Sequence, residues 1–439
     1  MNEPKTRREL LHSSAALLAA PAILKFPSVR RASRLRVGVI GCGGRGTGAA
    51  INAVQAAAES GVAVEIVALA DAFADRVRTC RDELAKPENG VVEHVLAGDA
   101  DCHAGLDSYR KVVEAPLDAV VLATSPHFRP IHLAAAIEAG KHAFMEKPAG
   151  VDPSGIRSVL ASAELADARR LSIVAGTQRR HEQCYLEAMA RIRAGDIGRI
   201  VAARCSWNQG GLWVKPRQPE WTDMEWQLRN WLYFTWTSGD HIVEQHVHNL
   251  DVVRWALGAQ DAAADADLHL VGVDPLAARG MGGRQVRTQP EYGHIFDHFA
   301  VEYEFPGNVI ASSQCRQIDG SDSAVEEVLI GTLGTCVLRS GSAEITGARP
   351  WRWSGTHNPY LQEHVDLQRA IASDAPVNEA RQVAHSTLMA VMGRMSAYTG
   401  KTVSWDFARG SQLDLAPGTY ELGALQPTEV AVPGRTPLI

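Results

Sequence analysis

The stretch RVGVIGCGGRG, residues 36–46, decides the fold, because an apolar run leads directly into the spacing Gly-x-Gly-x-x-Gly. In such a turn Gly41 permits the tight bend and Gly43 lets the backbone approach a pyrophosphate. Gly46 lets the following helix pack closely on the sheet. The stretch therefore predicts a dinucleotide-binding turn.

The segment after this turn strengthens the prediction. A helix with an apolar face, formed by residues 49–54, follows the turn, and its first amides would face the phosphates. We expect Gly44 and Arg45 to contact the cofactor there. A second apolar strand, residues 64–70, follows and ends at Asp71. A carboxylate at that place accepts hydrogen bonds from a ribose diol and repels a 2′-phosphate, which favours NAD. Arg76 and Arg78 keep NADP as the less favoured alternative.

Strands and helices continue to alternate, which predicts a doubly wound parallel sheet and an NAD-binding Rossmann domain over residues 35–177. Three further strands are expected, at residues 117–124, 141–145 and 171–176, and the last closes this domain. Ligands of open α/β sheets bind at the carboxyl ends of the strands. We therefore expect further cofactor contacts from Thr124, Pro126, His127, Glu146 and Lys147.

Beyond residue 177 the pattern changes to alternating polar and apolar residues. Residues 201–207 and 298–305 alternate in this way, and Pro306-Gly307-Asn308 marks a hairpin after the second segment. We expect a substrate and oligomerisation domain of the α+β class over residues 178–425, with an open, largely antiparallel sheet. A C-terminal tail, residues 426–439, follows it.

The first residues resemble a targeting signal. Arg7 and Arg8 precede an alanine-rich apolar run from Leu10 to Leu24, and basic residues follow that run. This order resembles a bacterial twin-arginine export signal. We expect residues 1–34 to be signal and linker, and the protein to be periplasmic or otherwise exported. A frayed N-terminal helix on a cytoplasmic protein is the alternative.

Composition excludes several classes of protein. With 439 residues, 46% of them hydrophobic, the chain can bury two cores. The net charge is −6 and the sequence has no basic stripe, so nothing indicates a nucleic-acid-binding surface. A small molecule is the expected partner. The seven cysteines show no paired spacing typical of zinc or thiol-redox sites.

Four separated motifs occur in a characteristic order. They are the glycine turn, ATSPH at 123–127, EAGKH leading to Glu-Lys-Pro at 146–148, and GDHIVEQHVHNLD at 239–251. Together they resemble the glucose-fructose oxidoreductase, inositol dehydrogenase and rhizopine catabolism family, over about residues 35–405. The resemblance implies NAD binding, a substrate held between the two domains, and a homodimer or homotetramer formed through the C-terminal sheet.

Within these motifs Lys147, Glu244 and His248 are the candidates for catalysis. Lys147 would hydrogen-bond a sugar hydroxyl and, with a pKa lowered by burial, share in proton removal. Where the family commonly has an Asp and a His four residues later, this chain has Glu244 and His248. We expect His248 to take the hydroxyl proton and Glu244 to orient it or to bind a neighbouring hydroxyl.

The spacing of His241, Glu244 and His248 places them on one face of a continuous helix. A metal site is the other interpretation of that spacing. Hydride transfer already accounts for an acid and bases here, so we expect no metal. Substrate contacts are expected from Arg180, His181, His241 and His246, with a helix cap as the alternative role for His181.

A tryptophan-rich insertion spans residues 207–236. It either packs on the sheet as a loop or forms an aromatic wall for a sugar ring. The C-terminal segment around residues 393–401 is similar to an exported branch of the family that acts on sugars and glycosides.

The sequence thus predicts an exported oxidoreductase that moves a hydride between a carbohydrate ring hydroxyl and tightly bound NAD. Tight binding is expected because the twin-arginine route exports folded proteins, which must carry a cytoplasmic nucleotide with them. The alternative is an NAD-assisted glycoside hydrolase that works by transient oxidation, elimination and re-reduction. A non-enzymatic sugar or nucleotide sensor is disfavoured, because two bases converge at the nicotinamide position.

Overall fold

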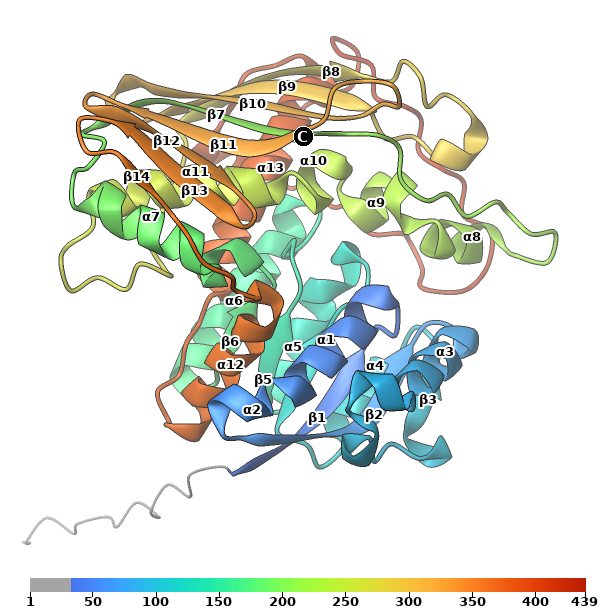
Figure 1. Cartoon of the computed structure of the whole chain (residues 1–439). Coiled ribbons are helices and arrows are strands. Elements are labelled where there is room, and N and C mark those ends of the chain that lie inside the picture. The colour runs from blue at the N-terminus through green and yellow to red at the C-terminus, as the bar shows by residue number, and fades with distance from the viewer. Residues whose placement is uncertain (1–32) are drawn as a thin grey trace, which may run out of the picture. The chain divides into compact units, whose positions relative to one another are not determined.

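Two β-sheets, each with its own helices, make up the part of the chain that the structure, a computed structural model, describes (Figure 1). The described residues are 33–439. The twin-arginine segment therefore lies outside them. In residues 33–439 no helix is both long and apolar enough to cross a membrane.

The first sheet has six parallel strands in the order β3-β2-β1-β4-β5-β6. Alternate residues of β4 enter two different cores: Val120 and Leu122 lie in one, Ala119 and Val121 in the other. Burial on both faces explains why this strand is an unbroken apolar run. The strands are β1 (Arg34–Ile40), β2 (Ala63–Asp71), β3 (Cys102–Ala104), β4 (Ala119–Leu122), β5 (His142–Met145) and β6 (Ile173–Ala175).

Helices cover both faces of this sheet. The helices are α1 (Gly44–Gln55), α2 (Ala57–Ser60), α3 (Ala74–Leu84), α4 (Tyr109–Glu114), α5 (Arg129–Glu138), α6 (Pro153–Arg169) and α12 (Pro359–Ala372). Helices α4, α5 and α6 pack on one face, and α1, α3 and α12 on the other. Helix α12 comes from the C-terminal part of the chain, so the first sheet is completed from a distant segment. The expected domain boundaries stay a prediction.

The second sheet has nine strands in the order β14-β13-β12-β11-β7-β10-β9-β8-β15. Only β7 and β10 run parallel; the other pairs are antiparallel, which confirms the expected class. The expected hairpin joins β9 to β10. The strands are β7 (Ile200–Gln209), β8 (Ala277–Gly283), β9 (His298–Phe305), β10 (Val309–Gln317), β11 (Ala324–Gly331), β12 (Gly334–Arg339), β13 (Ser342–Gly347), β14 (Trp351–Arg352) and β15 (Val403–Ser404).

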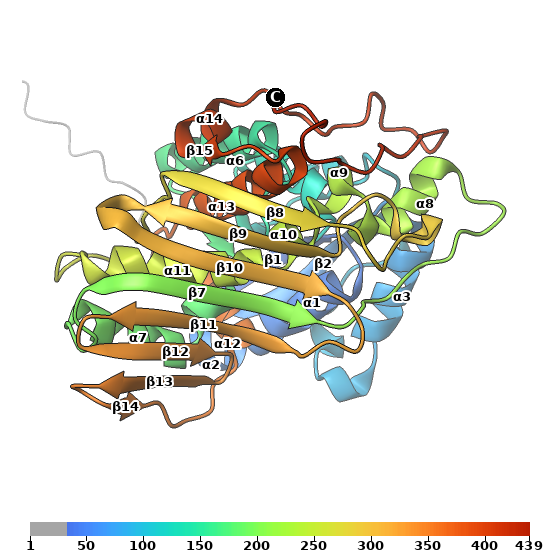
Figure 2. The same ribbon diagram turned by 90° about the horizontal axis from the view of Figure 1, so that it is seen from above.

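One face of the second sheet packs on α7 (Gln183–Arg193), α11 (Val247–Gln260) and α13 (Ala380–Thr399). Figure 2 shows the opposite face without helices over it. Apolar side chains such as Met281 and Ile310 are exposed. This is the face through which an oligomer is expected, and the oligomer stays a prediction.

Short helices and a long tail complete the chain. The short helices are α8 (Asp223–Arg229), α9 (Thr235–Ser238), α10 (His241–Glu244) and α14 (Trp405–Gly410). The tail after α14 is tied to both parts of the chain: the Leu415 amide donates to Asp152, and the Leu425 amide donates to Asp223.

The glycine turn has the geometry that the sequence predicts. Gly41 has φ +104°, and a Cβ there would lie 2.5 Å from the backbone of Ala123. A Cβ on Gly46 would lie 1.8 Å from the carbonyl oxygen of Gly41, so α1 can pack this closely only with glycine at 46. The confirmed turn brings the start of α1 to the carboxyl edge of the sheet.

We expect Gly46→Ala to lower the free energy of unfolding by roughly 1–3 kcal/mol, the range for overpacking, because rigid backbone must shift. Gly48→Ala is the matched control, since nothing lies within 4 Å of its new Cβ and alanine favours a helix. Denaturant unfolding of both variants tests this. Equal effects would contradict the assigned close approach.

Candidate functional site

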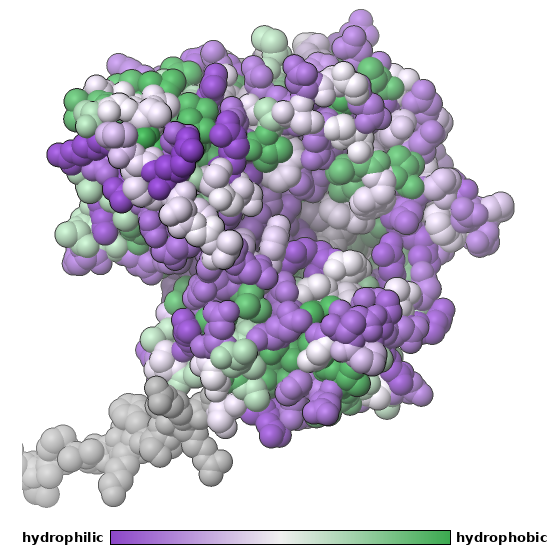
Figure 3. Space-filling view, in the orientation of Figure 1, coloured by the Kyte–Doolittle hydropathy of each residue, from purple (hydrophilic) through white to green (hydrophobic). Residues whose placement is uncertain are grey.

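A cleft runs along the carboxyl edge of the first sheet. Its wider part, about 440 Å³, is lined by Gly43, Arg45, Lys147 and Glu244 among others. Its narrower part, about 120 Å³, contains Asp71 in its lining. The two parts share lining residues at Gly43, Arg76, Thr124, Ser125 and Trp231. Figure 3 shows the surface hollowed between the parts of the chain that carry the two sheets.

The start of α1 fits a dinucleotide phosphate. Its N-cap, Gly43, has no side chain to cap the free amides, and a Cβ on Gly44 would meet nothing within 4 Å. Arg45 stands beside these amides, held by an ion pair to Glu146 (2.6 Å) and lying 4.7 Å from the centre of the Tyr360 ring. The open space at Gly44, the free amides of α1 and the positive charge of Arg45 together suit a bound anion.

Asp71 ends β2 at the narrower part of the cleft. Its carboxylate accepts the amides of Cys42 (2.8 Å) and Phe73 (3.0 Å), which fixes its orientation. Burial raises the pKa of Asp71, although both hydrogen bonds oppose the shift. The carboxylate keeps acceptor capacity toward the cleft, as a ribose diol requires.

Lys147 and Glu244 meet in the wider part of the cleft. Lys147 follows β5, before a cis peptide bond to Pro148, and its Nζ donates to the backbone carbonyl of Glu244. Burial lowers the pKa of Lys147. An amine with a lowered pKa can donate to a hydroxyl and gives up its proton more readily than an exposed lysine does.

The Glu244 carboxyl is buried, and its Oε1 has no partner among the described residues. Burial raises its pKa to about 7, although the charge of Lys147 opposes the shift. A carboxyl poised near neutrality in a cleft is suited to general acid–base work.

His248 lies close by but outside the lining of the wide part of the cleft. Its ring stacks on Trp207, with 5.7 Å between ring centres and 25° between planes. Burial, then the charges of Lys147 and Arg179, lower its pKa well below its usual value. His248 is therefore neutral at pH 7.

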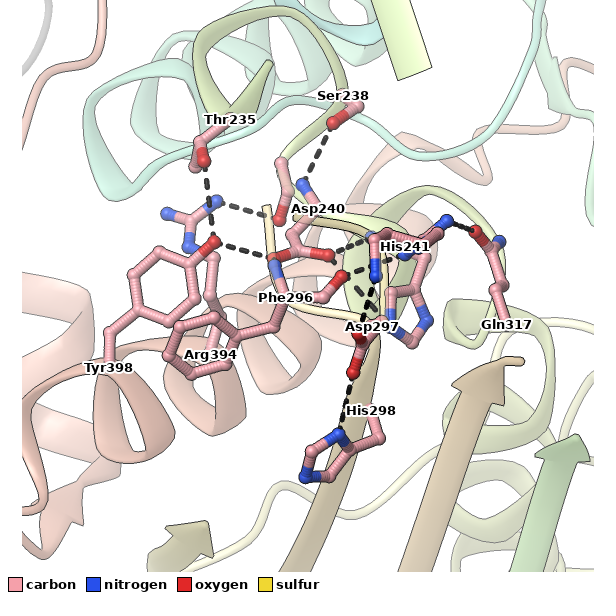
Figure 4. Close-up of polar contacts among 12 residues, drawn as sticks. Thr235, Ser238, Asp240, His241, Phe296, Asp297, His298, Gln317, Arg394 and Tyr398 are labelled. Carbon is pink, nitrogen blue, oxygen red and sulfur yellow. Dashed lines mark hydrogen bonds and ion pairs between the residues drawn. The ribbon is translucent and has the colours of Figure 1, made fainter. Parts of the chain in front are cut away.

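Asp240 sets the direction of α10. It adopts φ 71°, uncommon for a residue with a side chain, and its carboxylate accepts the amides of His241 and Phe296. Tyr398 of α13 donates to the same carboxylate, and Arg394 donates to the carbonyl of Gly239 (Figure 4). This network fixes the short helix that ends at Glu244.

The expected continuous helix is wrong. Helix α10 ends at Glu244 and α11 begins at Val247, with Gln245 and His246 in the turn between them. His241, Glu244 and His248 therefore do not share one helical face. The break leaves the Glu244 carbonyl free to accept from Lys147.

Several expected contacts point elsewhere. Pro126 and His127 do not line the cleft, and Nε2 of His127 lies 2.8 Å from the Tyr420 hydroxyl of the tail. Thr124 does line it. A buried aromatic cluster, in which Trp236 and Phe128 contact the His127 ring edge-on, draws this histidine away from the cofactor.

The four residues expected to touch substrate, Arg180, His181, His241 and His246, instead contact partners within the protein. Arg180 pairs with both oxygens of Asp251, at 2.9 and 3.0 Å. The other partners are Ser313 for His246, Phe299 for His241, and Asp366 with Glu379 for His181. None of the four lines the cleft.

Two charged residues in the lining of the wide part were not expected from the sequence. Arg129 donates to the carbonyls of Pro148 (3.0 Å) and Thr124 (2.9 Å), and so braces the ends of two strands. Lys215 adds a second cation from the tryptophan-rich insertion. In the sequence, the signal for Arg129 is a charge at the start of an apolar helix.

The tryptophan-rich insertion is divided between a buried aromatic cluster and the lining of the cleft. Trp213 and Trp231 line the wide part of the cleft, with ring centres 6.2 Å apart. Trp226 is instead buried in an aromatic cluster with Phe234. One half of the insertion thus anchors the loop, and the other half gives the cleft an aromatic wall.

Comparison with known proteins finds a family match over part of the chain. Residues 35–173 match the model of the oxidoreductase family with an NAD-binding Rossmann fold. Inositol 2-dehydrogenase 3 of Saccharopolyspora erythraea is 28% identical over 230 residues, which are 52% of this chain and 56% of that protein. Inositol 2-dehydrogenase of Acidothermus cellulolyticus is 28% identical over 351 residues, 79% of this chain and 83% of that protein.

Solved structures show the same fold. A levoglucosan dehydrogenase in complex with NADH and levoglucosan is 17% identical and superposes with a TM-score of 0.64. The match covers 84% of this chain and 99% of that one. An aldose-aldose oxidoreductase of Caulobacter crescentus, complexed with glycerol, gives 15% identity and a TM-score of 0.63 over the same shares.

Glu244→Gln should become more stable relative to the wild type as pH rises. In the folded protein Glu244 holds its proton up to about pH 7, whereas in the unfolded chain it titrates near 4.5. Rising pH between those values therefore favours unfolding of the wild type, by up to about 3 kcal/mol, and the amide has no such penalty.

Denaturant unfolding of both proteins from pH 5 to pH 8 measures this difference. Glu302→Gln, on the exposed face of β9, is the control and should show no such trend. A difference between Glu244→Gln and the wild type that stays constant with pH would mean that Glu244 is ionised throughout.

Proposed function

We propose that the protein oxidises or reduces a ring hydroxyl of a carbohydrate with NAD. The match of residues 35–173 to the oxidoreductase family with an NAD-binding Rossmann fold supports this. One observation carries the proposal. The buried, unpartnered carboxyl of Glu244 lies with Lys147 in the same cleft that continues to the glycine turn. Proton-transfer groups and a nucleotide site therefore share one enclosure.

A carbohydrate suits the lining of the cleft. Trp213 and Trp231 offer flat apolar faces to a sugar ring, and Lys147, Lys215 and Glu244 offer polar partners to its hydroxyls. The relatives and solved structures named above act, by their names, on inositol, levoglucosan and aldoses, which are polyhydroxylated rings or their open forms.

Three side chains handle the proton. Nζ of Lys147 hydrogen-bonds the reacting hydroxyl, and the Glu244 carboxylate takes its proton, because a pKa of about 7 suits a base at neutral pH. His248, neutral beside Trp207 and outside the lining of the wide part, supports the proton transfer from behind these two groups. When bound, the nicotinamide ring accepts or supplies the hydride at the carbinol carbon.

Net oxidation is favoured over the hydrolytic alternative, because the named relatives are dehydrogenases and oxidoreductases. Export by the twin-arginine route rests on residues 6–24, outside the described residues. Retention of NAD through export follows from that signal and belongs to the same proposal.

Asp71 should decide the choice of nucleotide. Asp71→Ala removes the ribose acceptor and the charge that repels a 2′-phosphate. The preference for NAD over NADP should fall at least about tenfold, as expected for one hydrogen bond to a charged group. Titration of nucleotide-free protein with each nucleotide measures the ratio, and Asp82→Ala, exposed on α3, should leave it unchanged.

Wild-type protein that binds NADP as tightly as NAD would contradict this assignment. Arg76, which lines both parts of the cleft, would then be the reader of the 2′-phosphate.

Glu244 should control the pH dependence of the reaction. In the oxidation direction the base must be unprotonated, so kcat/KM of the wild type should rise with pH through about 7 and then level off. Glu244→Gln should lose this limb and slow the chemical step by about 10²-fold or more. His248→Ala should be slower as well but keep the limb.

Kinetics with a cyclic polyol or aldose, followed by NADH absorbance, give both profiles. Glu302→Gln serves as the control and should match the wild type. A limb that survives in Glu244→Gln and disappears in His248→Ala would move the role of base to His248.

A further inference from the structure

A second cluster of ligand-type side chains lies outside the cleft. His181, His269 and Glu379 each present one ligand atom, and these atoms lie within 4.8 Å of one another. The three residues come from the 3₁₀ helix at Gln178–His181, the loop after α11, and the residue before α13. We name them the His181 cluster.

The orientation of His181 aims its Nε2 into this cluster. Its Nδ1 lies 2.7 Å from Oδ2 of Asp366, which can only accept, so Nδ1 carries the hydrogen. Asp366 is itself held by Gln362, whose Nε2 donates to the other oxygen at 2.7 Å. A carboxylate behind a histidine is the usual support of a metal-ligating imidazole.

The opposite nitrogen of His181 is buried and has no hydrogen-bond partner among the described residues. It lies 3.4 Å from Oε1 of Glu379, an acceptor. In the metal-free protein a proton on Nε2 bridges to this carboxylate, and a metal ion would take the place of that proton. The other oxygen of Glu379 accepts the Ala175 amide at 2.7 Å, which fixes this carboxylate in place.

The distance suits a tetrahedral ion. With bonds of about 2.0–2.1 Å, two ligand atoms of tetrahedral zinc lie about 3.4 Å apart. His269 is partly exposed and gives a path from solvent, and its backbone carbonyl is held by Arg180 at 2.7 Å. Imidazole and carboxylate are ligands that zinc accepts.

We propose that the His181 cluster binds a zinc ion, with His181, His269 and Glu379 as ligands and water in the fourth position. Asp366 supports His181 from behind. The ion joins the crossover between the two sheets to α12 and α13. The cluster does not line the cleft, so the ion stabilises this junction and takes no part in the proposed proton transfer.

A proton competes with the metal at this place. Burial lowers the pKa of His181, but the carboxylates of Glu379, Asp366 and Glu363 outweigh it and raise that pKa to about 10. His269, which neighbours Asp366, is the other titratable group facing the cluster. Zinc binding must therefore release a proton.

The test uses the whole protein, freed of metal with a chelator, and Zn²⁺ as the probe. Calorimetric titration in two buffers of different ionisation enthalpy should show one zinc per chain and proton release. His269→Ala, at a partly exposed position, should weaken binding at least about tenfold, and Asp366→Asn by about 10–100-fold. His298→Ala, which removes another histidine paired with an aspartate, should bind like the wild type.

Thermal unfolding gives a second measurement. Zinc should raise the melting temperature of the wild type and of His298→Ala but not that of His269→Ala. No zinc uptake by the wild type, or uptake of equal affinity by His269→Ala, would overturn the proposal and leave an imidazolium between two carboxylates. Neither measurement depends on the proposed oxidoreductase activity.

Discussion

The hydrogen bond from Lys147 to the carbonyl of Glu244 is the contact on which the site depends, because it joins the edge of the first sheet to the helices under the second. It exists only because α10 stops at Glu244 and leaves that carbonyl without a helical partner. The amine and the nearby carboxyl are both poorly solvated, and each offsets part of the other's cost of burial. The hydrogen bond therefore holds an amine with a lowered pKa near a carboxyl with a raised pKa, as proton transfer requires.

The cofactor end of the cleft depends in turn on a distant segment. Helix α12 covers the first sheet beside α1 and places Tyr360 next to the Arg45 side chain. Glu363 of the same helix is fully buried with no partner for either oxygen among the described residues, and burial together with the charge of Glu146 raises its pKa well above the usual value. The Glu146 carboxylate, which raises the pKa of Glu363, pairs with Arg45. The surroundings of the nucleotide turn are thus set more than 300 residues further along the chain.

The sequence predicts best those features that local chemistry determines. The turn at Gly41, the strand that ends in Asp71 and the β9–β10 hairpin follow from backbone geometry and strand periodicity, and the structure has all three. The break before α11 could not be predicted, since its polar residues fit a helix and only Asp240, held by Phe296 and Tyr398, sets the preceding turn. The sequence suggests substrate contacts for Arg180 and His246 because it does not show their actual partners. These partners, Asp251 and Ser313, are remote in sequence. Polar residues near a site are ambiguous until such partners are known.

Residues 179–181, in the crossover between the two sheets, show that the site depends on contacts between the two sheets and not on one of them alone. In three consecutive residues, Arg179 lies over the Trp207 ring, Arg180 pairs with Asp251 of α11, and His181 enters the metal-type cluster. Because His248 stacks on the same Trp207 ring, the Arg179 charge contributes to keeping that histidine neutral. Arg179 is in turn neutralised by Glu327 of β11, which also holds Asn249, the next residue after His248. A change in the contacts of Arg179 would therefore alter the charge around His248 without changing the lining of the cleft. In this way the packing of the two sheets affects the acid–base chemistry between them.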